Sequence, residues 1–273
     1  MNAPSEGGKL NFRNTEFAFA HKSDRELKRT FRLFKMIDSP FLTKIGPPLV
    51  TFALKLRLPI IGLIKKTIFD IFCGGVSLED TRHRSEELFK NGAYTILDYS
   101  VEGKNTEESY DATRDEIIRT IKQGAKHEAV AFSAMKVSGI ADSGILTKLD
   151  AGETLSAEEQ AALERGKARL EAICSVSEEL GQPVFIDAEE SWFQDAIDAW
   201  AEEMMAKYNR SKAVIYTTTQ MYRHDRLAYL KALIARSKAD GYVLGVKVVR
   251  GAYIEKENNR AAEKNYPTPM PVS

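Results

Sequence analysis

The sequence predicts a parallel α/β fold, and three observations support this prediction. Short apolar runs recur along the chain, and the last three begin near residues 183, 213 and 243. An interval of about 30 residues is the length of one strand–helix repeat. The runs are continuous rather than alternating, which indicates strands buried on both faces, as in parallel sheets. Helical patterns lie between the runs, so the alternatives are an open doubly wound sheet and an eight-fold barrel.

Length and composition indicate a folded globular protein. The chain has 273 residues, of which 43% are hydrophobic and 29% are charged, and such fractions exclude global disorder. The 39 Lys and Arg residues balance the 39 Asp and Glu residues, which argues against a nucleic-acid binder. Cys73, Cys174 and four scattered histidines match neither a disulfide framework nor a metal motif. We therefore expect no metal and a reducing compartment.

The N-terminal part of the chain is basic and apolar. Residues 1–72 carry 13 Lys and Arg against 6 Asp and Glu, with phenylalanines and leucines between them. Such a segment is typical of a helical cap packed on its own domain, or of a patch that meets an anionic membrane surface. Gly74-Gly75 marks a boundary. We therefore predict a helical arm over 1–75 and a separate domain over 76–273.

No targeting or membrane-spanning segment is expected. The polar N-terminus lacks the basic-then-apolar order of a signal peptide, and no clear transit peptide is present. The apolar stretch 45–64 contains two charged residues and three prolines, so it does not read as a spanning helix. We expect a cytoplasmic protein, peripheral on the inner face of the membrane at most, or a mitochondrial one if the source is eukaryotic.

The first strand–helix repeats follow the predicted boundary. Ser77 with Asp80 three positions later is a helix N-cap signal, and Asn91-Gly92 is a stop signal. A helix is therefore predicted between them. Next come a β-prone run at 93–99 and a polar helix at 107–124. A second β-prone run at 129–137 and a loop of small residues at 138–152 follow.

Three further strands complete the pattern. Ser156 and Glu159 form a capping box, and Gly181 and Gly241 stop the helices that precede them. Apolar residues recur at helical spacing after Ser191. The expected order is helix 156–181, strand 183–187, helix 191–208, strand 213–218, helix 223–239 and strand 242–249.

Polar side chains gather at the C-terminal ends of the five predicted strands, where ligands bind in parallel α/β folds. The five ends carry Asp98, Lys136, Asp187–Glu190, Thr217–Gln220 and Arg250–Tyr253. Lys136 is flanked by apolar and small residues, so it needs an anion or an acidic partner. The structural alternative is an ion pair of Lys136 with Asp98 or Asp187. If all these charges are structural, the chain is a non-catalytic α/β module.

Searches for common catalytic motifs are negative. No G-x-G-x-x-G follows a strand, no phosphate-binding loop is present, and no G-x-S-x-G elbow occurs. Asp187 could also cap the helix expected after Ser191. Glu189 and Glu190 are adjacent and should point apart, so this pair is weak evidence for acid–base chemistry.

Four segments carry a family resemblance. Gly245–Tyr253 (GVKVVRGAY), followed by residues 255–262, resembles the signature of proline dehydrogenases. Phe185–Glu190, Ala131–Val137 and Tyr216–Gln220 are similar to further blocks of that family, in the family's order. The resemblance implies a distorted (β/α)8 barrel that binds FAD. It also implies oxidation of L-proline to Δ1-pyrroline-5-carboxylate, the first step of proline catabolism, with electrons passed to a quinone.

The resemblance implies roles for nine residues. The expected catalytic residues are Lys136, Asp187 and Arg250. The expected cofactor-binding residues are Asp187, Ala188, Gln220, Lys247, Arg250, Gly251 and Ala252. The expected substrate-binding residues are Lys136, which would hold the proline carboxylate, and Tyr253, which would pack on the proline ring. Arg250 would lie near the flavin N5 edge, and Gly251 and Ala252 would allow close backbone approach.

The chain departs from the family pattern in length. Five strands end at Val249, and three more repeats would need roughly 90 residues. The family's paired-arginine motif, which clamps the proline carboxylate, has no counterpart here. We therefore expect about five strand–helix repeats with open sheet edges. We also expect this chain alone to bind FAD weakly and to turn over little. A flavoenzyme for a related cyclic amine such as hydroxyproline stays an alternative.

Overall fold

The computed structural model forms two compact units, Met1–Gly92 and Ala93–Ser273. The predicted boundary at residue 75 lies inside the N-terminal unit, and the domain organisation stays a prediction. The first twelve residues, on which the signal-peptide argument rests, lie outside the described residues. The structure describes residues 13, 15–19, 22–56, 58–64, 67, 69–75, 77–99 and 105–270.

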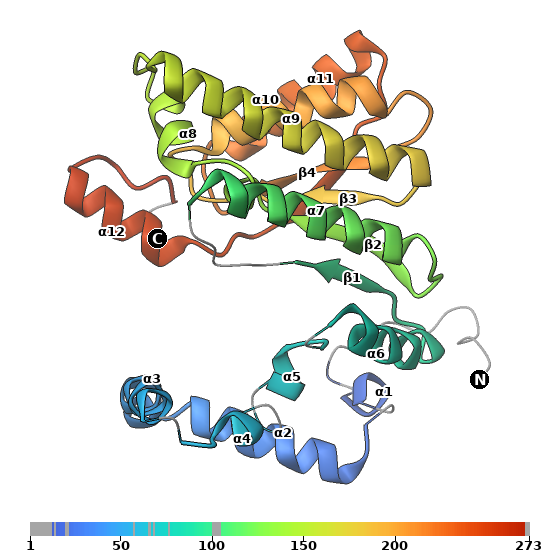
Figure 1. The fold of residues 1–273 in the computed structure, drawn as a ribbon, viewed down its shortest axis with the longest axis vertical. Helices are drawn as coiled ribbons and strands as arrows, with labels where there is room; N and C mark the ends of the chain where they lie inside the picture. Colours follow the sequence, from blue (N-terminus) through green and yellow to red (C-terminus); the bar gives the residue numbers. More distant parts are fainter. Residues whose placement is uncertain are drawn as a thin grey trace. The chain divides into compact units, whose positions relative to one another are not determined.

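The N-terminal unit is helical over its described residues. Two of its helices begin at sequence-encoded caps: Ser23 and Glu26 form a capping box for α2, and the Ser77 hydroxyl accepts a hydrogen bond from the Asp80 N–H at the start of α6. The second of these caps confirms the predicted helix start. The helices are α1 (Thr15–Phe19), α2 (Asp24–Ile37), α3 (Pro40–Lys55), α4 (Ile61–Ile64), α5 (Asp70–Phe72) and α6 (Leu78–Lys90) (Figure 1).

Membrane-spanning helices are not found in the part of the chain that the structure describes, because no helix there is both long and apolar enough. The apolar stretch 45–64 instead contributes to two separate helices, α3 and α4.

The C-terminal unit is built on a five-stranded parallel sheet. The strands pair in chain order, so each neighbour in sequence is a neighbour in space. They form a curled half-barrel, which confirms the predicted parallel α/β fold with five repeats. β1 and β5 are the edges of this sheet. The strands are β1 (Thr95–Asp98), β2 (Val130–Met135), β3 (Val184–Ile186), β4 (Ile215–Gln220) and β5 (Val246–Val249).

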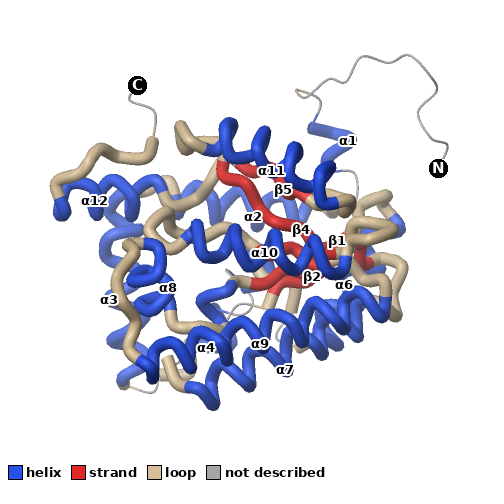
Figure 2. The backbone as a smooth tube through the Cα atoms, turned by 90° about the horizontal axis from the view of Figure 1, so that it is seen from above, coloured by secondary structure: helices blue, strands red, loops and turns tan. Residues whose placement is uncertain are grey.

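Four helices cover one face of this sheet in the order α7, α9, α10, α11 (Figures 1 and 2). Their bounds are Glu107–Gly124, Ala157–Leu180, Gln194–Tyr208 and Arg226–Asp240. The capping box of Ser156 and Glu159 starts α9, and Gly181 ends it in the left-handed conformation, as predicted. The core lies between these helices and the strands and includes Ile117, Met135, Leu170, Ile173, Ile186, Ile197 and Ile215, all fully buried.

Two helices differ from the sequence prediction. The predicted loop 138–152 is wrong, because it contains a 3-10 turn (Val137–Gly139) and the helix α8 (Ser143–Asp150). The Asp142 carboxylate caps α8 by accepting hydrogen bonds from two backbone N–H groups, and Leu146 is fully buried. A second unexpected helix, α12 (Ile254–Lys264), follows β5.

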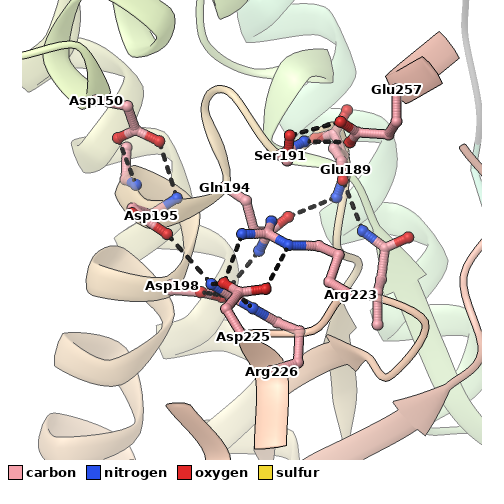
Figure 3. A network of polar contacts seen from close by, with 12 residues as sticks. Asp150, Glu189, Ser191, Gln194, Asp195, Asp198, Arg223, Asp225, Arg226 and Glu257 are labelled. Atoms are coloured by element: carbon pink, nitrogen blue, oxygen red, sulfur yellow. Dashed lines mark hydrogen bonds and ion pairs between the residues drawn. The ribbon is translucent and has the colours of Figure 1, made fainter. Parts of the chain in front are cut away.

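The buried carboxyl of Asp198 and the half-buried carboxyl of Asp150 should make the stability of the C-terminal unit depend on pH. Asp150 accepts hydrogen bonds from the Asp195 and Ala196 N–H groups at the start of α10, and Asp198 pairs with Arg226 (Figure 3). Burial raises the pKa of both Asp150 and Asp198 to about 6. The native state therefore binds these protons more tightly than the unfolded state. These two groups should make the C-terminal unit more stable as the pH falls from 7 to 5.

Urea unfolding at pH 7.5, 6 and 5, monitored by tryptophan fluorescence, checks this prediction. The fluorescence reports on the C-terminal unit, because the chain's two tryptophans, Trp192 and Trp200, both belong to it. Asp150→Asn should reduce the slope of stability against pH, whatever it does to stability at one pH. A wild-type profile that falls steadily from pH 7.5 to 5 would contradict the assignment. The opposite trend is expected only near pH 2 to 4, where Glu107 titrates, since hydrogen bonds from Arg165 and Arg169 lower its pKa to about 2.

Candidate active site

A cavity of about 430 Å³ opens at the C-terminal ends of β2, β3, β4 and β5. This volume is typical of small-molecule sites. All nine residues to which the resemblance assigns a role line it. Thr218, which the sequence places at the end of the fourth strand without a role, also lines it, and Val249 was missed. The lining residues are Lys136, Asp187, Ala188, Thr218, Gln220, Lys247, Val249, Arg250, Gly251, Ala252 and Tyr253. Parallel pairing of the strands brings these distant segments together.

Lys136 directly follows β2 and is partly buried. Within the described residues it forms no ion pair, so the structural alternative of a salt bridge with Asp98 or Asp187 is not found there. Asp98 nevertheless lies within its electrostatic reach: burial raises the pKa of the Asp98 carboxyl, and Lys136 and Lys247 partly offset that rise. The Lys136 charge is therefore available to a ligand in the cavity.

Asp187 pairs instead with Lys247. The Lys247 Nζ donates to Asp187 Oδ1 at 2.6 Å, and the Thr218 hydroxyl donates to the same oxygen at 3.3 Å. The Lys247 ammonium also lies 5.0 Å from the centre of the Phe185 ring. Asp187 does not cap α10, whose N-cap position is Phe193. The pair fixes two functional groups of opposite charge on the wall of the cavity.

Gln220 is held by a backbone group of the neighbouring loop. Its Nε2 donates to the Glu189 carbonyl at 2.7 Å, and the residue is buried. One end of the amide is therefore engaged within the fold, which fixes how the side chain lies at the cavity.

The segment after β5 forms the remaining wall. Backbone hydrogen bonds continue past the strands, from Met221 N–H to Val249 O and from Tyr222 N–H to Arg250 O, both at 2.8 Å. Arg250 is exposed and forms no ion pair with a described residue. Burial raises the pKa of the Tyr253 phenol, so Tyr253 stays neutral and offers an aromatic surface.

The charge of the cavity is positive. The Asp187–Lys247 pair is neutral as a unit, whereas Lys136 and Arg250 add two charges without a partner among the described residues. Ala188, Val249 and Ala252 supply apolar lining. Such a site suits a flat, partly apolar ligand together with an anionic group.

The sequence of this chain is similar to those of known proteins. A sequence model of the family described as proline dehydrogenase matches residues 81–273. A carbapenem antibiotics biosynthesis protein, CarD, of Pectobacterium carotovorum is 31% identical over 196 residues, covering 72% of this chain and 52% of that protein. The mitochondrial proline dehydrogenase 1 of Dictyostelium discoideum is 27% identical, covering 94% of this chain and 52% of that protein.

The fold is also known from solved structures. The crystal structure of proline utilization A from Bdellovibrio bacteriovorus matches with a TM-score of 0.66 at 17% identity, over 95% of this chain and 28% of that one. The chain thus spans about half the length of the curated relatives named above. Because the family model covers most of the chain, this protein belongs to the proline dehydrogenase family.

Proposed function

We propose that this chain carries the FAD- and proline-binding site of a proline dehydrogenase. That enzyme oxidises L-proline to Δ1-pyrroline-5-carboxylate and passes the electrons to a quinone. The observation that carries the proposal is the single cavity that gathers all nine predicted residues at the strand ends. The chain spans about half of its relatives, so we expect it to bind FAD weakly and to turn over slowly by itself.

The residues around the cavity fit a flavin. Apolar lining from Ala188, Val249 and Ala252 suits a flat ring system, and the cations Lys136 and Arg250 suit the negative charge that such a ring gains on reduction. Lys247 is held by Asp187, so it presents a fixed ammonium to the same space. FAD bound here would accept a hydride from the substrate carbon next to nitrogen.

The chain's own residues would bind and orient proline. Lys136 attracts the proline carboxylate, and the neutral Tyr253 ring provides an apolar surface for the pyrrolidine ring. Oxidation forms the C=N bond of the product, so the amine must lose its proton before the hydride leaves. Arg250, an exposed residue of the cavity wall, would stabilise the negative charge that the flavin ring gains on reduction.

Product formation tests this function. The purified chain with FAD and a quinone analogue should convert L-proline to a product that forms a coloured adduct with o-aminobenzaldehyde. Conversion should be slow and should fall at least tenfold in Lys136→Ala, whose cavity lacks the carboxylate partner. Faster conversion of 4-hydroxy-L-proline would favour the related cyclic amine instead. No product from either amine, with FAD bound, would contradict catalysis by this chain.

Lys247→Met is expected to weaken FAD binding by about tenfold, because it removes one fixed cation and leaves the Asp187 carboxylate facing the cavity. Isothermal titration with FAD measures the change. The double variant Lys247→Met/Asp187→Asn should recover part of the affinity, since it removes the unpaired carboxylate as well. Equal affinity of all three proteins would show that this pair plays no part in the cofactor site.

A second proposal concerns the basic N-terminal unit, which we infer to contact an anionic membrane surface from the cytoplasmic side. In α2, five basic residues accompany the exposed Phe31 and Phe34, and in α3 Phe41, Leu49 and Phe52 are exposed. Basic charge next to exposed aromatic rings favours the interface of an anionic bilayer. Co-sedimentation with phosphatidylserine vesicles should be strong in low salt and absent with phosphatidylcholine alone. Equal binding to both lipids, or none in low salt, would contradict it.

A further inference from the structure

Glu189 lies in the loop that follows β3 and forms hydrogen bonds with three other segments of the fold. It does not line the cavity. Its exposed fraction is 3%. Its carboxylate accepts hydrogen bonds from both the backbone N–H and the hydroxyl of Ser138, which lies two residues after Lys136. Its backbone N–H donates to Gln194 Oε1 at 2.7 Å (Figure 3). Its carbonyl accepts from Gln220 Nε2 at 2.7 Å. Four elements therefore meet at one residue: the turn after β2, the loop after β3, β4 and α10.

We propose that Glu189 is a positioning residue of the active site: its buried carboxylate ties the turn that carries Lys136 to the loop that carries Asp187. This inference rests on the proposed function, because it concerns the same cavity. Glu189 acts through other residues and touches no ligand.

The geometry favours positioning over a general packing role. The bond between Glu189 and Ser138 joins residues 51 positions apart, and the strands that precede them, β2 and β3, are neighbours in the sheet. Strand pairing ends at Met135 and Ile186, and beyond that point the Asp187 N–H donates to Met135 O at 2.9 Å. Beyond this backbone bond, the hydrogen bonds from Ser138 to the Glu189 carboxylate join the segment that contains Lys136 to the segment that contains Asp187.

The neighbouring glutamate provides a matched comparison. Glu190 is also buried, but its carboxylate accepts from Lys256 Nζ at 2.6 Å, on α12. The two adjacent side chains thus point to different elements, as expected from the sequence. Glu189 hydrogen-bonds to the turn after β2, and Glu190 hydrogen-bonds to α12.

The experiment compares Glu189→Ala, Glu189→Gln and Glu190→Ala in the full chain by hydrogen exchange without FAD, and then by FAD titration. Glu189→Ala should speed exchange of amides 136–141 by about tenfold, because the partly buried Ser138 donors lose their acceptor. Glu189→Gln should restore much of the protection, since its amide oxygen still accepts from the Ser138 N–H. Glu190→Ala should instead speed exchange at the start of α12 and leave 136–141 unchanged.

FAD affinity should follow the same order, with Glu189→Ala weakest, Glu189→Gln intermediate and Glu190→Ala close to wild type. Faster exchange spread over the whole C-terminal unit, or equal behaviour of Glu189→Ala and Glu190→Ala at 136–141, would overturn the inference. If Glu189→Ala does not fold, Glu189→Gln and Ser138→Ala decide it by local exchange at 136–141. A wild-type chain that binds no FAD would contradict the proposed function, whereas the exchange pattern would still decide the role of Glu189.

Discussion

Gly251→Ala is expected to destabilise the C-terminal unit by about 3 kcal/mol or more. Gly251 has φ 125°, a conformation that residues with a Cβ rarely adopt. A Cβ at this position would lie 2.3 Å from Cε1 of Tyr222, far inside contact distance of the tyrosine ring. Both the backbone and the ring would have to move. The glycine in this segment is therefore required by the fold, in addition to any close approach to a cofactor.

Urea unfolding followed by tryptophan fluorescence measures this effect, because both tryptophans lie in the C-terminal unit. Gly241→Ala is the matched control: Gly241 also has positive φ, at 68°, but no atom lies within 4 Å of the Cβ that would be added. That variant should lose only about 1 kcal/mol. Equal losses in the two variants would mean that the Tyr222 ring does not constrain Gly251.

Arg226→Met is expected to destabilise the C-terminal unit by about 3–5 kcal/mol at pH 7.5, because it leaves a buried carboxylate without its cation. The Arg226 Nη1 donates to Asp198 Oδ2 at 2.6 Å, and both side chains are about 5% exposed. Burial raises the pKa of Asp198 to about 6 even with Arg226 present. In the variant, this carboxyl should take up a proton more readily still, so the loss should be smaller at pH 5 than at pH 7.5.

The double variant Arg226→Met/Asp198→Leu separates charge from packing. Replacing both members of a buried ion pair by apolar residues is often close to neutral, so it should recover most of the stability. A double variant as unstable as Arg226→Met alone would show that packing, not the unpaired charge, explains the loss. The ion pair is also joined to the loop that follows β3, because Gln194 donates to Asp198 and accepts from the Glu189 N–H (Figure 3).

The approximate position of each strand end could be predicted from the sequence, and with it most of the candidate site. Continuous apolar runs mark buried parallel strands, and the polar residue that follows each run must lie at the same edge of the sheet. Lys136, Asp187 and Arg250 were found in this way, and the structure brings all three to one cavity.

The pairing of these charges could not be predicted. Asp187 takes Lys247 and not Lys136 as its partner, because Lys247 lies opposite Thr218 in the register of β4 and β5 and so extends toward Asp187. Register between strands depends on tertiary packing, which a single sequence does not show. The helix α8 was missed for a related reason: the small residues before and after it are typical of a loop, and only burial of Leu146 reveals the packing that stabilises the helix.

The visible absorption spectrum of the purified chain mixed with FAD, before and after L-proline is added without oxygen, tests the central claim most directly. If the cavity at the strand ends is the flavin and proline site, the FAD band should shift on mixing and bleach when proline is added. Bleaching should be slow, and at least tenfold slower still in Lys136→Ala. A spectrum identical to that of free FAD at every protein concentration would contradict the assignment of this cavity.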